Sequence, residues 1–134
     1  MKQTYSGGCH CGAVRFEADI DVAAGTDKCN CTICAKGRLW SFEVGVDAFR
    51  LLRGAEAQAD YTYNSAVAHH YFCRTCGIRS FEYVELPDVG RKYYNVSVVA
   101  LEGLDMDAVM AAPIKYQDGL HDRWDRVPNE VRHL

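Results

Sequence analysis

Seven cysteines constrain this chain of 134 residues more than any other feature, because all of them stand in short-spaced clusters. The three clusters are Cys9 with Cys11, Cys29 with Cys31 and Cys34, and Cys73 with Cys76. A C-x-C or C-x-x-C spacing lets both sulfurs of a turn reach about 2.3 Å from one tetrahedral zinc ion. An odd total also leaves one thiol over in any complete set of disulfides. The sequence therefore predicts metal sites rather than a disulfide framework.

Seven sulfurs divide into one closed site with four ligands and one open site with three. Closed four-cysteine sites usually stabilise a fold, whereas catalytic zinc keeps a coordination position free for water or substrate. The closed site is built most simply from the two pairs that lie far apart in sequence, Cys9, Cys11, Cys73 and Cys76. The open site is then the triplet, Cys29, Cys31 and Cys34. In the competing arrangement Cys73 and Cys76 join two members of the triplet, and nothing in the spacings excludes it.

Length and composition predict a single domain over residues 1–134 in the cytoplasm. No apolar run approaches the roughly 20 residues of a membrane span, and the first residues lack the apolar region of a signal peptide. Reduced thiols fit a reducing compartment. The formal charge of −3 and the pI near 5.9 argue against nucleic acid as a partner, because phosphate binding draws on clustered lysines and arginines.

Alternating apolar and polar residues predict a mainly β fold with an antiparallel sheet. Val14, Phe16, Ala18 and Ile20 alternate with polar residues, and Trp40, Phe42, Val44 and Val46 repeat the pattern. Further expected strands are 59–63, 68–72, 79–84 and 93–100. Helix is expected only at 32–36 and 105–111, the second stopped by Pro113. The tail, 115–134, is charged and broken by glycine and proline, so it is expected to wrap the domain or fray.

Histidines and carboxylates give weaker signals than the cysteines. His69 and His70 are adjacent in a strand pattern, so only one of them can face inward. His121 or His133 in the tail could instead supply a fourth ligand to the triplet and close that site. The carboxylates that could act as acid or base are Glu43, Glu82, Glu85 and Asp118, and no spacing singles one of them out.

The ordered segments GGCHCGAVRFE, CNCTICAKGR and YFCRTCG resemble the glutathione-dependent formaldehyde-activating enzyme family. The resemblance is clear from Gly7 to Gly77 and continues more faintly through YYNVSVVALEG and the pair Asp118 and Gly119. It implies a small zinc-stapled β-tent with few short helices. It also implies the same partition of ligands, a structural zinc on Cys9, Cys11, Cys73 and Cys76 and a catalytic zinc on Cys29, Cys31 and Cys34.

The resemblance further implies a carbon–sulfur lyase, which joins glutathione and formaldehyde into S-(hydroxymethyl)glutathione or cleaves that adduct. The partners would then be small molecules, glutathione or a related thiol and an aldehyde. Lys36 and Arg38 follow the triplet closely and are the expected contacts for the carboxylates of glutathione. The alternative is a non-catalytic zinc-stapled module that binds a protein partner. Only the enzyme requires a thiol to reach the triplet.

Overall fold

The computed structural model describes residues 1–134, and the fold is mainly β. Two sheets are built from ten strands: β1 (Gln3–Gly8), β2 (Arg15–Ile20), β3 (Thr26–Cys29), β4 (Ser41–Gly45), β5 (Phe49–Arg53), β6 (Gln58–Tyr61), β7 (Ala68–Cys73), β8 (Phe81–Leu86), β9 (Arg91–Ser97) and β10 (Ile114–Gln117). The two α-helices are α1 (Thr32–Gly37) and α2 (Met106–Ala111). Neither helix is long and apolar enough to cross a membrane.

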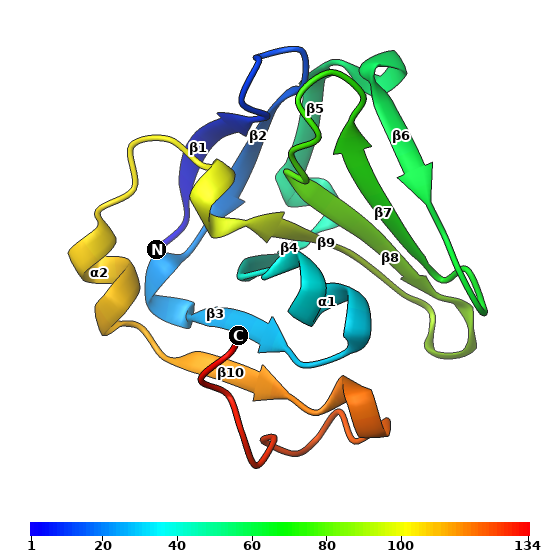
Figure 1. Cartoon of the computed structure of the whole chain (residues 1–134). Coiled ribbons are helices and arrows are strands. Elements are labelled where there is room, and N and C mark those ends of the chain that lie inside the picture. Colours follow the sequence, from blue (N-terminus) through cyan, green and yellow to red (C-terminus); the bar gives the residue numbers. More distant parts are fainter.

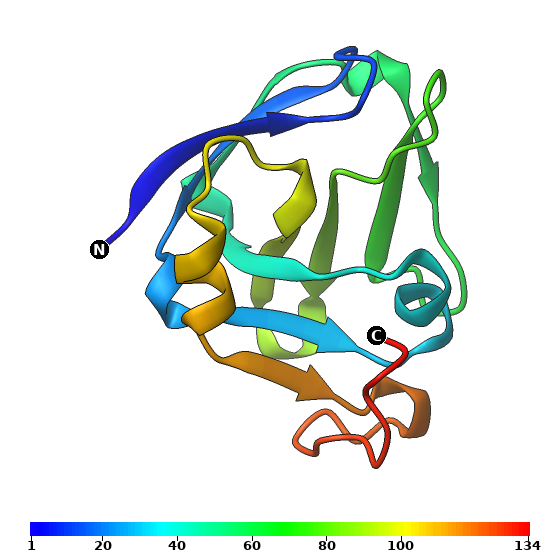
Figure 2. The same ribbon diagram turned by 60° about the vertical axis from the view of Figure 1, so that its left-hand side comes forward.

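The smaller sheet has the order β1-β2-β5, and the larger has the order β10-β3-β4-β9-β8-β7-β6. Figures 1 and 2 show the larger sheet curving from β10 at the bottom round to β6, with β1 and β2 closing over it. Every paired strand is antiparallel to its neighbours except β10, which runs parallel to β3. The expected antiparallel sheet is therefore confirmed, with one parallel edge added by the tail.

The core lies between the two sheets and is centred on aromatic rings. Phe16 is fully buried in β2, and its ring centroid lies 5.3 Å from that of Phe49 and 5.6 Å from that of Phe81. The alternation that predicted β2 is confirmed, because the three apolar residues of the strand and Val14 just before it are all buried. Such burial of large side chains is the main favourable term in folding.

Two expected elements end differently in the structure. The strand expected over 93–100 stops at Ser97, and Val98–Ala100 form a 3₁₀ turn. This turn buries both Val98 and Leu101 and leaves Val99 exposed, which suits a helix with three residues per turn better than a strand of period two. The strand expected over 59–63 ends at Tyr61.

Both short helices are confirmed, and the start of α2 is determined by a capping residue. The side chain of Asp105 accepts hydrogen bonds from the backbone N–H groups of Asp107 and Ala108, which is the usual role of an aspartate that caps a helix. After α2 the chain passes Pro113 into β10, which pairs with β3 next to the cysteine triplet. The tail therefore wraps the domain, which is the first of the two arrangements expected for it.

Candidate metal centres

Four cysteines from two segments of the chain meet beside the smaller sheet, with 62 positions between Cys11 and Cys73. Cys9 and Cys11 lie in the turn after β1, Cys73 ends β7, and Cys76 lies in the turn before β8. Their sulfurs all lie within 4.8 Å of one another. Cys11 Sγ lies 3.7 Å from Cys9 Sγ and 3.6 Å from Cys73 Sγ. The structure thus brings together the two pairs that sequence spacing joined.

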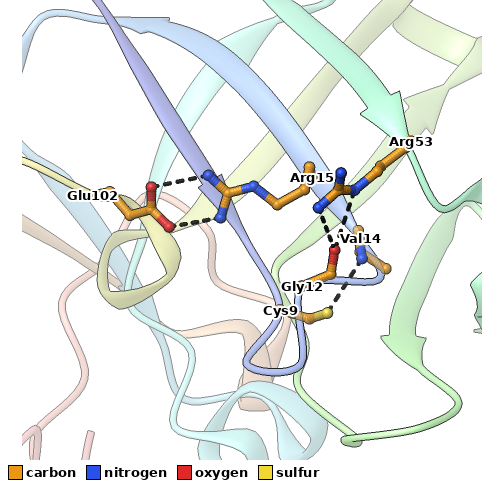
Figure 3. Close-up of polar contacts among 6 residues, drawn as sticks. All are labelled: Cys9, Gly12, Val14, Arg15, Arg53 and Glu102. Atoms are coloured by element: carbon orange, nitrogen blue, oxygen red, sulfur yellow. Dashed lines mark hydrogen bonds and ion pairs between the residues drawn. The ribbon is translucent and has the colours of Figure 1, made fainter.

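Hydrogen bonds shape the turn that carries Cys9 (Figure 3). The N–H of Val14 donates to Cys9 Sγ at 3.3 Å, which folds the turn back over the first sulfur. The guanidinium of Arg53 donates two hydrogen bonds, of 3.0 and 3.2 Å, to the carbonyl oxygen of Gly12. Gly12 has a φ of +83°, in the left-handed region that glycine adopts without strain. The two hydrogen bonds from Arg53 therefore hold the turn in addition to the contact with Cys9 Sγ.

The second centre contains Cys29, Cys31 and Cys34, which come from the end of β3 and the start of α1. Cys31 is the N-terminal cap of the helix and Cys34 lies one turn further along. The three sulfurs lie within 4.8 Å of one another, and no histidine or carboxylate joins this group. The alternative in which Cys73 and Cys76 join two members of the triplet is not the arrangement of the structure. Neither His121 nor His133 lies close enough to the three sulfurs to belong to this group.

The sulfur geometry fits tetrahedral metal ligation. In a tetrahedron the ligand–ligand distance is 1.63 times the metal–ligand distance, so a zinc–sulfur bond of about 2.3 Å requires sulfurs about 3.8 Å apart. The distances of 3.7 and 3.6 Å in the four-cysteine cluster approach this value and far exceed the roughly 2.05 Å of a disulfide, and the sulfurs of the triplet lie within 4.8 Å of one another. All seven cysteines are free. Both clusters can therefore hold a metal ion.

Each centre also contains a sulfur that ionises readily in the metal-free chain. Hydrogen bonds from the thiols of Cys31 and then Cys34 lower the pKa of Cys29 to about 3. In the four-cysteine cluster the backbone N–H groups of Cys11 and Ile78 lower the pKa of Cys76 to about 6. Metals bind the thiolate form, so each centre offers a ready first ligand.

The tail is fastened to the triplet by Asn30, which stands between Cys29 and Cys31 and is only 7% exposed. Its side-chain nitrogen donates to Asp118 Oδ1 at 2.7 Å, and its side-chain oxygen accepts from the N–H of Leu120 at 2.9 Å. Gly119 lies so close that a Cβ there would stand 2.6 Å from Cys29 Sγ. The tail therefore forms one wall of the triplet centre, which sequence reasoning missed.

Two cavities adjoin the triplet. A small one of about 40 Å³ is lined by Cys29 and Cys34 together with residues of β3, β4, β8 and β9. A larger cleft of about 480 Å³ lies between Asn30 and the tail, and its cationic side chains include Arg123 and Arg126. Lys36 and Arg38 are exposed on and just after the end of α1 and line neither cavity.

The histidines divide as the strand pattern predicted. His70 in β7 is buried and His69 is partly exposed, since neighbouring side chains of a strand face opposite ways. His70 Nδ1 lies 2.7 Å from Glu82 Oε2, and Glu82 lines the small cavity. Of the four carboxylates that the sequence offered, Glu82 and Asp118 are buried and bonded to a histidine, and Glu82 is the one of these two that lines the small cavity.

The fold and the sulfur clusters define a small, mainly β protein with two thiol centres suited to metal ions. Residues 4–114 match the family described as glutathione-dependent formaldehyde-activating enzyme, and the chain belongs to this family. The crystal structure of a Rhodobacter sphaeroides protein is similar to it, with 31% sequence identity and a TM-score of 0.69. That similarity covers 82% of this chain and 99% of the other. The family match ends at residue 114, before the tail cleft.

Proposed function

We propose that this protein is a zinc-dependent carbon–sulfur lyase, which forms or cleaves S-(hydroxymethyl)glutathione from glutathione and formaldehyde in the cytoplasm. Cys29, Cys31 and Cys34 hold the catalytic zinc. The four cysteines that hold the structural zinc are Cys9, Cys11, Cys73 and Cys76. Membership of the family supports this reaction class, and the observation that carries the proposal is the unequal division of the sulfurs into a group of four and a group of three.

The group of three leaves room for a sulfur from the substrate. Zinc bound there would accept the substrate thiol as a fourth ligand and favour its thiolate form. The chain itself supplies the fixed geometry, because β3 and α1 hold the three sulfurs and Asn30 fastens the tail beside them. Holding thiol and aldehyde together in this way replaces a bimolecular encounter by a reaction between neighbours.

Cationic side chains near the triplet are proposed to bind the carboxylates of glutathione. Lys36 and Arg38 remain candidates because both are exposed and close to the triplet in sequence. The tail cleft adds Arg123 and Arg126, which form no ion pair with any carboxylate of the chain. Arginine binds carboxylates through paired hydrogen bonds, and 480 Å³ is within the usual range for a small-ligand pocket.

The decisive experiment compares the two sulfur groups after cobalt substitution. Glutathione should change the ligand-field spectrum of the wild-type protein and of an Arg74→Ala control, which alters an exposed arginine outside both cavities. A Cys34→Ser variant should lose the metal of the triplet and the response to glutathione while keeping the other metal. A spectrum indifferent to glutathione in the wild type would instead indicate a non-catalytic zinc-stapled module.

Catalysis is tested by exchange NMR on formaldehyde and glutathione with and without the protein, since the reaction also proceeds unaided. We expect faster exchange only when the triplet is loaded. Arg38→Ala and Arg126→Ala should each raise the glutathione concentration needed for half-saturation without changing metal content. An unaltered half-saturation would remove that arginine from the proposed site.

A further inference from the structure

The small cavity beside the triplet has the size of a single small molecule. A bound water needs about 10 to 15 Å³ by the same measure, so 40 Å³ accommodates a compound of two or three non-hydrogen atoms. Formaldehyde has two such atoms and its hydrate three. The lining contains Cys29 and Cys34 on one side, with Glu82 and Asn95 from neighbouring strands. A molecule in this cavity therefore lies between the sulfurs and a carboxylate.

Glu82 is held by partners on both adjacent strands. It is opposite His70 in the β7–β8 pairing and opposite Asn95 in the β8–β9 pairing. Its Oε2 lies 2.7 Å from His70 Nδ1, and its Oε1 accepts from Asn95 Nδ2 at 3.1 Å. Only 5% of the Glu82 side chain and 5% of the His70 side chain are exposed. The carboxylate thus has a fixed orientation in a water-poor setting.

The contact between Glu82 and His70 requires a proton. A carboxylate oxygen and an unprotonated imidazole nitrogen would repel each other at 2.7 Å, so one hydrogen lies between them. Arg79 Nη2 lies 3.5 Å from the same oxygen and 3.4 Å from the same nitrogen, which places a permanent positive charge beside the pair. A buried pair that stores one mobile proton is the arrangement needed for general acid–base catalysis.

Among the carboxylates near the triplet, Glu82 alone both lines the small cavity and is bonded to a buried histidine. Asp27 lines the cavity but forms no side-chain hydrogen bond or ion pair, and the buried Asp118, bonded to Asn30 and His121, lines the tail cleft instead. Glu43 lines the cavity, but its side chain is 38% exposed and is paired with Arg91. Glu85 follows in the same strand as Glu82, is 45% exposed and is paired with Lys92. Glu82 is also not among the potential metal ligands of the triplet, which are the three cysteines alone.

We propose that Glu82 is the catalytic acid and base of the lyase reaction and that His70 positions it. This inference rests on the proposed function. In the forward direction the thiolate sulfur attacks the aldehyde carbon, a carbon–sulfur bond forms, and the π electrons of the carbonyl move to oxygen. The Glu82–His70 pair gives that oxygen its proton and recovers one from the next thiol that ionises. The overall reaction adds the thiol to the aldehyde and gives the S-hydroxymethyl adduct with no other product. Cleavage of the adduct reverses the bond formation and both proton transfers.

The test is Glu82→Gln in the zinc-loaded protein, with Glu85→Gln as the matched control on the same strand. We expect the exchange rate constant at saturating glutathione to fall about 100-fold in Glu82→Gln, the size typical of a lost general acid–base group. Half-saturation should stay the same within about twofold, because ground-state binding does not involve the proton. The control should match the wild type.

A second measurement reports on the pair without catalysis. Asn95 continues to donate toward residue 82, so a glutamine there turns its NH₂ toward His70 Nδ1. The nitrogen-15 signal of His70 Nδ1 should then change to the unprotonated, acceptor type, and glutathione should still perturb the cobalt spectrum. Loss of metal or of that perturbation would show that Glu82 serves structure and would overturn the inference.

The outcomes separate the two proposals. A wild type that does not catalyse exchange refutes the proposed function and this inference with it. An active wild type together with a Glu82→Gln variant less than about tenfold slower refutes only the role of Glu82. An active wild type, a normal control and a variant at least tenfold slower with intact thiol binding support both.

Discussion

Replacing Asn30 with alanine should loosen the tail from the triplet centre. The side chain makes two hydrogen bonds, to Asp118 and from the N–H of Leu120, and it is buried. A hydrogen bond contributes about 1 kcal/mol net, and the abandoned N–H adds a desolvation cost. We therefore expect the variant to lose about 2 to 3 kcal/mol of the free energy that keeps the tail closed.

Native-state hydrogen exchange measures this loss locally. The N–H of Asp118 bonds to the carbonyl of Arg126, so its protection reports on closure of the tail. Since 1.4 kcal/mol corresponds to a factor of ten, protection at that amide should fall about 30- to 150-fold in Asn30→Ala. Amides in the centre of the sheet, such as that of Val96, should keep their wild-type rates.

The matched control is Asn129→Ala, which removes an exposed asparagine from the same cleft. A surface change of this kind is expected to alter stability by less than about 0.5 kcal/mol. The reasoning would be refuted if Asn30→Ala left the Asp118 amide protected to within about threefold of the wild type, or if both variants lost protection equally.

Three further predictions follow from the core, the tail and its charges. Phe16→Ala should cost about 3 to 5 kcal/mol of unfolding free energy in denaturant titrations, because the ring is fully buried; a cost below about 1 kcal/mol would contradict this. Gly119→Ala should lower metal content by the one ion of the triplet, since its methyl group would stand 2.6 Å from Cys29 Sγ, and unchanged metal content would contradict it. Hydrogen bonds from Asn30 and then His121 hold the pKa of Asp118 below its ordinary value. The ionised carboxylate therefore contributes its full stabilisation above about pH 4, and this contribution is lost as the pH falls through the lowered pKa. In Asn30→Ala the titration of Asp118, followed by carbon-13 NMR, should move to higher pH. An identical titration in both proteins would refute the assignment.

The sequence was most informative where a local pattern determines the structure. Short spacers bring neighbouring sulfurs together whatever the rest of the chain does, so the three cysteine clusters were predictable. That Cys73 and Cys76 join Cys9 and Cys11 rather than the triplet was left open by the spacings and is decided by the folded chain. The same holds for β2 and β4, whose alternation reflects one buried face. Which metal binds, and whether residues 1–134 form one domain, remain predictions.

Four strands were missed because their residues carry no such pattern. β3 and β10 have four residues each, and their parallel pairing joins segments about 90 positions apart. β1 is polar and ends in Gly7 and Gly8, while β5 is apolar on consecutive residues. These strands form because neighbouring strands offer hydrogen-bond partners, a tertiary effect that local propensity does not encode.

The same limit applies to the polar contacts at the triplet. Asn30 and Asp118 are 88 residues apart, and His70 and Glu82 meet only because β7 and β8 pair in one register. No composition or spacing rule links such side chains. The sequence showed that either His69 or His70 faces inward. The carboxylate partner of that histidine could be found only in the folded chain.

Strand β7 runs between the four-cysteine group and Glu82, which lines the cavity beside the triplet. It ends at Cys73 in the group of four, and three residues earlier it carries His70 beside Glu82. Cys76 in that group is only partly buried, and backbone N–H groups lower its pKa to about 6, so in the metal-free chain it is the sulfur that oxidants and electrophiles attack most readily. Oxidation of that sulfur would remove one of the four groups gathered around the end of β7, three residues from the buried imidazole of His70.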